Sequence, residues 1–160
     1  MEDIWNITAL VVSVLSVLLS LYALRQATTK NTSDMYLFFI SQYAKEDMKL
    51  ALRKLKDIKR GVYRLGQWER DMKNNLPKAF EYDEARRLVK YFYDTLAYMK
   101  LEKLIEARFV RLICLKKGAW LYLDTVEAME KFFDSGYDKK PYAVIRDVCE
   151  NLRKEGCCPP

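Results

Sequence analysis

The chain has 160 residues, and its 28 Lys and Arg exceed its 22 Asp and Glu by six. It contains no histidine, which excludes mixed Cys/His zinc sites, histidine-dependent nucleophilic triads and Glu-x-x-His di-iron bundles. Its four cysteines lack C-x-x-C spacing, and no glycine-rich phosphate loop, nucleophile elbow or paired-carboxylate signature is present. We therefore expect no enzymatic activity, no cofactor and no metal.

An apolar segment opens the chain, because Ile7–Leu24 holds eleven Leu, Val or Ile residues and no ionised side chain. A helix over 4–26 would match the ~30 Å hydrocarbon core of a bilayer, with Trp5 and Tyr22 near the two interfaces. The acidic start of the chain does not fit a cleaved signal peptide, and a helix that is apolar on all sides needs lipid or a large core around it. We predict a transmembrane signal-anchor helix over 4–26, with a signal peptide or a buried helix as the alternatives.

Basic residues flank this segment only on its C-terminal side, beginning with Arg25 and Lys30. Because Lys and Arg are retained in the cytoplasm, we expect a single-pass protein of the cell membrane with its N-terminus outside. The predicted organisation continues with a juxtamembrane segment at 27–32, a cytoplasmic helical domain at 33–155 and a flexible tail at 156–160.

The cytoplasmic part is basic, since the 136 residues after Leu24 hold all 28 Lys and Arg and carry a net charge of +8. An anionic lipid bilayer is the partner that such a tethered domain would meet first. Charges of both signs are mixed along the chain and no Arg/Gly/aromatic run occurs, which argues against nucleic acid.

Small residues recur along the apolar segment at alternating steps of four and three. A seam of this kind lets two helices approach closely in lipid. Two interpretations stay open: the seam packs two copies into a homo-oligomer, or Ser and Ala are simply tolerated in a spanning helix. The seam consists of Ala9, Ser13, Ser16, Ser20 and Ala23.

The first cytoplasmic helix is predicted to run without interruption over 35–58, with Ser33 or Asp34 as its N-cap. The residues expected on its inward stripe are Ala44, Met48, Ala51, Leu52, Leu55 and Ile58.

A basic strip lies beside this stripe, in a sector of about 80° that contains no acid. We interpret it as a lipid- or anion-contact surface, in which each residue near an anionic leaflet contributes ~1 kcal/mol. The alternative is a solvated face with local ion pairs such as Arg53 with Asp57. The strip consists of Lys45, Lys49, Arg53, Lys56 and Arg60.

Further helices are predicted over 84–100, 101–117 and 119–133, with Asp83 as a cap of the first and Gly118 as the junction of the last two. The final helix is expected to begin at Pro141, a favoured first helical position. Its apolar side is expected to contain Val144, Ile145, Val148, Cys149 and Leu152. The fold class is all-α: an N-terminal transmembrane helix followed by a cytoplasmic helical bundle of about four to six helices.

An alternative concerns the region 108–133, where "RLICL" and "WLYLD" could form a hairpin around Lys116-Lys117-Gly118. That hairpin would make a winged-helix-like module, and the protein would then be a membrane-tethered nucleic-acid-binding regulator. The role of the segment 61–80 is open.

A few stretches carry a resemblance to known sequences: LRQAT at 24–28, Phe92, Leu104-Ile105 and Trp120. With them the chain resembles a family of prokaryotic proteins that is catalogued only as a domain of unknown function. The resemblance implies a single-pass, N-terminally anchored helical protein, and it implies no activity because none is established for the family. The sequence thus favours a membrane-anchored helical interaction or scaffold protein with an unknown protein partner.

Overall fold

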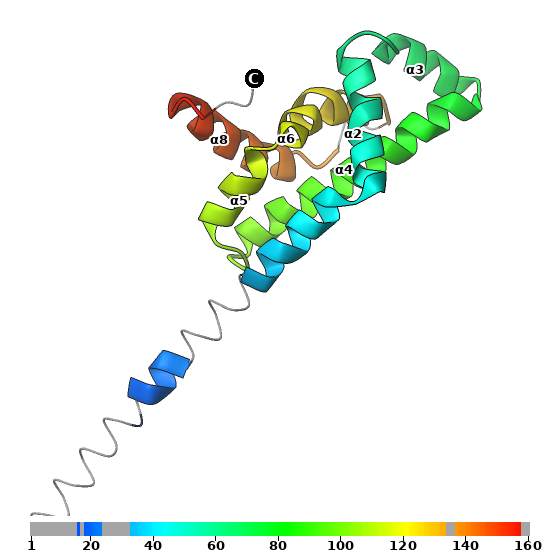
Figure 1. The fold of residues 1–160 in the computed structure, drawn as a ribbon. Helices are drawn as coiled ribbons and strands as arrows, with labels where there is room; N and C mark the ends of the chain where they lie inside the picture. The colour runs from blue at the N-terminus through cyan, green and yellow to red at the C-terminus, as the bar shows by residue number, and fades with distance from the viewer. Residues whose placement is uncertain (1–15, 17, 24–32, 134–136, 158–160) are drawn as a thin grey trace, which may run out of the picture. The chain divides into compact units, whose positions relative to one another are not determined.

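The computed structural model describes residues 16, 18–23, 33–133 and 137–157. All regular structure within these ranges is helical and no strand is present in them, so the all-α prediction is confirmed (Figure 1). The chain divides into two compact units, residues 1–37 and residues 38–160.

Within the first unit, residues 18–23 and 33–37 are helical. Among the residues that the structure describes, no helix is both long and apolar enough to cross a membrane. Most of the predicted anchor, 4–26, and the whole juxtamembrane segment, 27–32, lie outside the described residues.

The second unit begins with helical residues 38–44 and continues through a series of mostly short helices. They are α2 (Glu46–Lys59), α3 (Leu65–Lys73), α4 (Pro77–Leu101), α5 (Ala107–Cys114), α6 (Lys117–Leu121), the π-helical turn η1 (Tyr122–Val126), α7 (Glu127–Phe133) and α8 (Lys140–Lys154).

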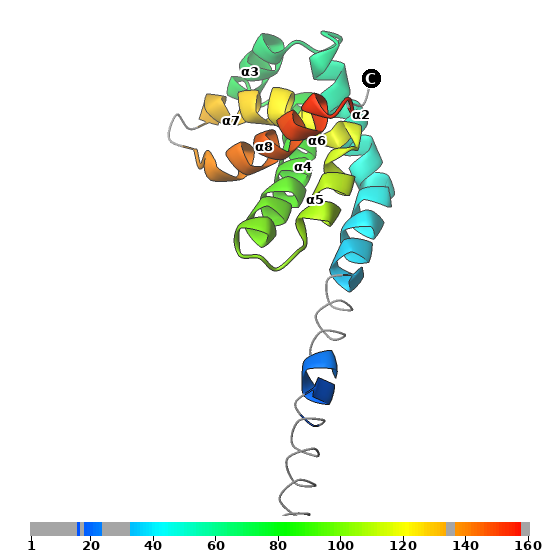
Figure 2. The same ribbon diagram turned by 90° about the vertical axis from the view of Figure 1, so that its left-hand side faces the viewer.

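The longest of these helices, α4, is the centre of the unit (Figure 2). Its 25 residues extend about 37 Å, and α2, α3, α5, η1 and α8 all pack against it. Val89, Tyr93 and Leu96 on α4 are fully buried. A single apolar core therefore surrounds one helix, and the surrounding helices supply its outer layer.

The predicted continuous helix over 35–58 is wrong at Lys45, whose backbone is extended (φ −60°, ψ 147°). Helical residues 33–44 end there and α2 begins at the next residue. The break lets Phe39 and Tyr43 face Phe92 of α4, while α2 buries Met48, Ala51, Leu55 and Ile58 as predicted. Ala44, assigned to the same inward stripe, is exposed because it lies before the break.

The start of α4 also differs from the prediction, since the helix begins at Pro77 and not after Asp83. Proline is favoured in the first turn of a helix because it needs no amide partner there. Asp83 lies inside the helix, where its carboxylate binds Arg86 and Arg87 one turn later. A carboxylate paired at these spacings needs no free helix terminus.

Several helices end in the same hydrogen-bonded turn. After α2, Gly61 has φ +76°, the amide of Gly61 donates to Ile58 at 3.0 Å and the amide of Val62 donates to Asp57 at 3.0 Å. The ends of α3, α4 and α8 repeat this pattern with Asn75, Lys103 and Gly156 in the left-handed position.

Gly118 does not join two helices as predicted, because it lies inside α6 and is buried. A Cβ at this position would lie 2.7 Å from the hydroxyl of Tyr93 and 3.1 Å from Leu52 Cδ2. The close approach of side chains, rather than a turn, requires the glycine. The break between the predicted helices falls at Leu115 and Lys116, and the predicted helix over 119–133 is divided among α6, η1 and α7.

Candidate functional site

An apolar groove of about 370 Å³ opens on the second unit between residues 38–44, α2 and α4. Its floor is aromatic and aliphatic, and a few polar side chains stand at its rim. The lining side chains are Phe38, Phe39, Gln42, Lys45, Asp47, Met48, Leu88, Tyr91, Phe92 and Thr95.

The floor of the groove is held in place by edge-to-face aromatic contacts. The ring of Phe39, which is 2% exposed, meets Phe92 with centroids 5.4 Å apart at 82°. Tyr43 lies 5.8 Å from the same ring, and its hydroxyl accepts a hydrogen bond from the amide of Gly118 at 3.2 Å. Such ring pairs add roughly 0.5–1.5 kcal/mol beyond their burial, so the groove has a preformed floor.

The rim of the groove leaves large apolar side chains in solvent. Phe38 is 54% exposed, Tyr91 is 74% exposed and Leu88 is 38% exposed. Single exposed apolar residues are ordinary on protein surfaces, whereas a contiguous group around a hollow is typical of an interaction site. The groove therefore has the exposed apolar lining that is typical of a surface that binds another apolar surface.

The predicted basic strip is exposed along its whole length. Lys49, Arg53 and Lys56 lie on α2, whereas Lys45 precedes the helix and Arg60 ends it. Lys49 lies 3.4 Å from Glu46, an exposed pair of the kind that contributes at most about 1 kcal/mol. The described residues contain no ion pair between Arg53 and Asp57, the pair expected for a merely solvated face.

Only part of the predicted small-residue seam can be placed, since Ala9 and Ser13 lie outside the described residues. Ser16, Ser20 and Ala23 are helical and exposed. The hydroxyl of Ser20 donates to the carbonyl oxygen of Ser16 at 2.8 Å, within its own helix. The contribution of this hydroxyl to helix pairing would thus come from its lone pairs and from its small size.

The hairpin proposed for 108–133 is wrong, because this region consists of α5, α6, η1 and α7. The tertiary setting explains why: Ile113 and Ala119 are both fully buried, and Tyr122 stacks on Tyr142 of α8 with centroids 4.5 Å apart. Apolar residues at helical spacing fill the core here, and no winged-helix module is formed.

A second concentration of functional groups lies between α4 and α7 and was not anticipated. Asp83 is 1% exposed. Its carboxylate accepts a hydrogen bond from Arg86 Nε at 2.7 Å and forms an ion pair with Arg87 at 2.6 Å. Arg86 also pairs with Glu130, and its guanidinium lies 4.7 Å from the ring centre of Phe133. Buried ions of this kind persist when each has an opposite charge beside it, so the cluster is structural.

A related group links α7 to α8 around Glu127. Its carboxylate accepts from the hydroxyl of Tyr137 at 2.7 Å and pairs with Arg146. Burial, and then the bond to Glu127, raise the pKa of Tyr137 to about 12. Burial also raises the pKa values of Tyr122 and Tyr93, so the core tyrosines stay protonated at neutral pH.

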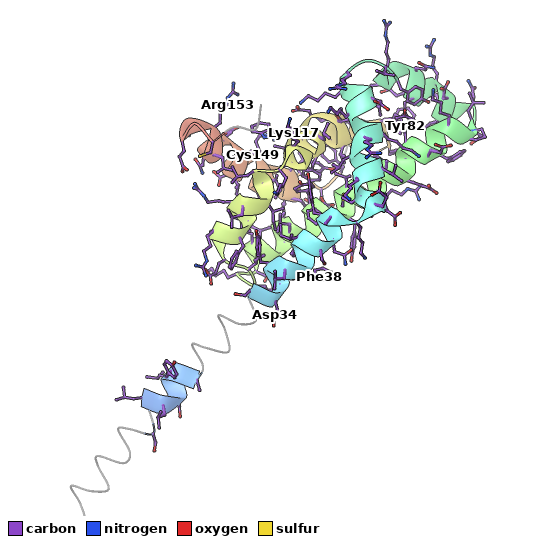
Figure 3. All side chains as sticks on the ribbon, viewed as in Figure 1. Asp34, Phe38, Tyr82, Lys117, Cys149 and Arg153 are labelled. Carbon is purple, nitrogen blue, oxygen red and sulfur yellow. The ribbon has the colours of Figure 1, made fainter. Side chains whose placement is uncertain are left out.

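Cys149 is buried on α8, as predicted (Figure 3). Its thiol interacts with that of Cys114, which is buried on α5. A hydrogen bond between the two thiols, together with burial, raises the pKa of Cys114. The same hydrogen bond lowers the pKa of Cys149. A buried thiol of raised pKa, such as that of Cys114, is a poor nucleophile and a poor metal ligand. Within the described part of the chain, no group of three or more Cys, Asp or Glu is placed to hold a metal ion.

The groove and the charged clusters were missed for different reasons. Asp83, Arg86 and Arg87 stand at the i, i+3 and i+4 spacing of helical ion pairs, so their pairing was visible in the sequence. The exposure of Leu88 and Tyr91 was not visible in the sequence, because it depends on whether a neighbouring helix covers these residues.

No protein-family model matches this chain, and comparisons with curated proteins and with solved structures likewise give no match.

Proposed function

We propose that the chain is a membrane-anchored helical interaction protein of scaffold type, whose apolar groove rests on the lipid surface. The observation that carries this proposal is the exposed aromatic rim of the groove, formed by Phe38, Leu88 and Tyr91. An amphipathic surface that buries such side chains at the headgroup level gains apolar contact without crossing the bilayer.

The position of the groove along the chain supports lipid as its occupant. Phe38 follows the end of the predicted anchor at residue 26 by only twelve residues, so a bilayer crossed by that anchor would be within reach. Tethering of this kind gives a high effective concentration and makes even a weak surface contact persist. Tyrosine and phenylalanine at the rim suit the interfacial zone of a bilayer.

The basic strip adds electrostatic attraction to the same contact. Lys45 lies in the groove lining, and Lys49 and Arg53 follow it along α2. Near an anionic leaflet each of these cations would contribute about 1 kcal/mol, in addition to the apolar contact. The small-residue seam in the anchor would allow two copies to assemble, and the rest of the helical unit would be free to bind a protein partner.

The test uses the full-length protein in nanodiscs that contain anionic lipid, with Cys157 and Cys158 replaced by serine. An environment-sensitive fluorophore is attached at Tyr91→Cys, and in a matched variant at Asn74→Cys, directly after α3. We expect blue-shifted emission at position 91 and water-like emission at position 74. Water-like emission at both positions, or a shift that follows protein concentration rather than lipid, would exclude lipid as the occupant.

A second arm tests the anchor itself. Replacing Val14 and Leu18 by aspartate adds several kcal/mol to the cost of insertion, so the variant should be released from membranes by a carbonate wash that leaves the wild type bound. If wild type and variant are both released, the anchor prediction is wrong.

A further inference from the structure

The net charge of the chain is concentrated in one short region. Residues 53–78 contain nine Lys and Arg against three Asp and Glu, a net charge of +6 that equals the net charge of the whole protein. The remaining residues are balanced, with nineteen of each sign. Averaged composition, in which both signs are mixed, conceals this concentration.

The structure places eight of these cations on the second half of α2, in the turn 60–64 and on α3, and the ninth, Lys78, at the start of α4. Two of the nine cations are paired, Lys54 with Glu81 at 2.9 Å and Lys59 with Asp124 at 2.6 Å. Arg60, Arg64 and Arg70 are exposed, and no acidic side chain of the described residues pairs with them.

A hollow of about 490 Å³ opens between Arg64 and Arg70, next to Arg60 in the chain. Its lining residues are Gly61, Val62, Arg64, Gly66, Gln67 and Arg70. No aromatic side chain lines it, and its two glycines leave bare backbone at its wall. A concave, cationic, amide-bearing surface is unlike the apolar groove and fits a polyanionic chain better than a flat bilayer.

The outward face of α3 carries side chains that donate hydrogen bonds. Gln67 and Arg70 on the helix and Asn74 at its C-cap recur at helical spacing and are exposed. Trp68 on the opposite face is buried and donates from Nε1 to the carbonyl of Ala79 at 3.2 Å. One face of α3 is thus packed against the core, and the opposite face is accessible to a partner. Two helices joined by a short glycine-containing turn are one way in which proteins present such a face to nucleic acid.

The location of this surface separates it from the groove. Phe38 and α3 lie at opposite ends of the run formed by residues 38–44 and α2 (Figure 3). A partner bound at α3 would therefore not compete with lipid at Phe38, Leu88 and Tyr91.

We propose that the turn 60–64 and the outward face of α3 bind the sugar–phosphate backbone of a nucleic acid. Arg60, Arg64 and Arg70 contact phosphates, and Gln67 donates from its amide within the hollow. This inference does not rest on the proposed lipid contact of the groove, and either one can fail without the other.

The test uses the full-length protein in nanodiscs of neutral lipid. Binding of a fluorescent DNA duplex and of a fluorescent single-stranded RNA is followed by anisotropy across salt concentrations. The basic-end variant combines Arg60→Gln, Arg64→Gln and Arg70→Gln. The matched control removes the same charge elsewhere through Lys116→Gln, Lys117→Gln and Arg153→Gln, all at exposed positions outside α3. Lys117 and Arg153 are labelled in Figure 3.

We expect the wild type to bind at least one of the two nucleic acids, and which one it binds identifies the source of the phosphate backbone. The basic-end variant should lose about tenfold or more in affinity, and its log–log salt slope should be smaller by about two to three. The control variant should change affinity by less than about threefold. Equal losses in the two variants would show attraction by net charge alone and would overturn the proposal.

A vesicle arm decides between nucleic acid and lipid at this surface. If the arginine substitutions weaken binding to separate phosphatidylglycerol vesicles and leave nucleic-acid binding unchanged, the surface is a lipid site and the proposal is wrong. Failure of the wild type to bind either nucleic acid at low salt would also overturn it.

Discussion

The buried carboxylate of Asp83 and the exposed guanidinium of Arg64 show two ways in which this helical unit carries charge. Asp83 is 1% exposed and has two arginines within 2.7 Å. Arg64 is exposed and lines a hollow without an acidic partner among the described residues. Desolvation makes an unpaired charge intolerable inside α4, whereas water tolerates it at α3. Interior charges thus bear on stability, and exterior charges are available to a partner.

The largest expected effect comes from Arg86, which pairs with both Asp83 and Glu130. Arg86→Ala removes the buried cation that Asp83 and Glu130 share, and leaves them only the exposed Arg87 and a 3.9 Å contact from Lys90 to Glu130. The substitution should lower the free energy of unfolding by about 3–5 kcal/mol. Arg87→Ala is the control, because Arg87 binds the same Asp83 from a side chain that is 68% exposed. The control should cost about 1 kcal/mol or less. Urea unfolding of the full-length protein in detergent measures both, and equal costs would remove the distinction between interior and exterior pairs.

Glycine gives a second contrast between inside and outside. Gly118→Ala would place a Cβ 2.7 Å from the hydroxyl of Tyr93, so we expect a loss of about 1–3 kcal/mol. Gly66→Ala adds a methyl group that meets nothing within 4 Å and should stabilise α3 by about 0.5–1 kcal/mol. Opposite signs in thermal unfolding are the predicted result. A gain at Gly118 would mean that the tyrosines retreat at little cost.

Alkaline pH should destabilise the protein through its buried tyrosines. The pKa of Tyr137 is raised from 10 to about 12, so the native state favours the protonated phenol. The stability that Tyr137 contributes is fully present below pH 10 and is lost as the pH rises through about 12. The reason is that this phenol ionises at a lower pH in the unfolded chain than in the native state. Tyr137→Phe should lower stability at neutral pH by about 1 kcal/mol and flatten this decline. Tyr91→Phe, at a 74% exposed position, should leave the profile unchanged. Melting temperatures across this range measure both, and a Tyr137→Phe profile as steep as the wild-type one would contradict the assignment.

The smallest expected effect lies at the end of α4, where Lys103 holds φ +56°. A side chain in the left-handed region is strained by about 1–2 kcal/mol, part of which a glycine recovers. Lys103→Gly should therefore raise the free energy of unfolding by about 0.5–1 kcal/mol, as measured by urea titration. Asn75→Gly is the control at φ +53°, and its gain should be smaller because asparagine tolerates this conformation. A loss at Lys103 would show that its side chain makes a stabilising contact.

Much of the fold followed from local patterns in the sequence. The helix that contains Pro141 begins one residue before it, and Ile145, Val148 and Leu152 are buried on its predicted side. The inward stripe of α2 was largely correct as well. Both patterns are local, since they depend on helical spacing and on the preference of proline for a first turn.

The errors arose where distant contacts override local preference. The sequence near Lys45 contains no signal for a helix break, because the break depends on the packing of Phe39 and Tyr43 against Phe92. Gly118 looked like a junction, yet the hydroxyls of Tyr43 and Tyr93 require it inside a helix. The groove was equally hidden, since the sequence of α4 does not say which of its apolar residues a neighbour covers. The basic strip was placed correctly on the surface, but its role stays a prediction.

The pair of buried thiols can report how often the interface between α5 and α8 opens. Cys114 and Cys149 belong to α5 and α8 and are shielded from solvent, while Cys157, three residues beyond α8, is exposed. A thiol-alkylating reagent should modify Cys157 at once and reach the inner pair only when α8 lifts from α5. The rate at which the inner thiols are alkylated, followed by the mass of the protein, therefore measures how often this interface opens. A ligand that slows this alkylation binds the closed form.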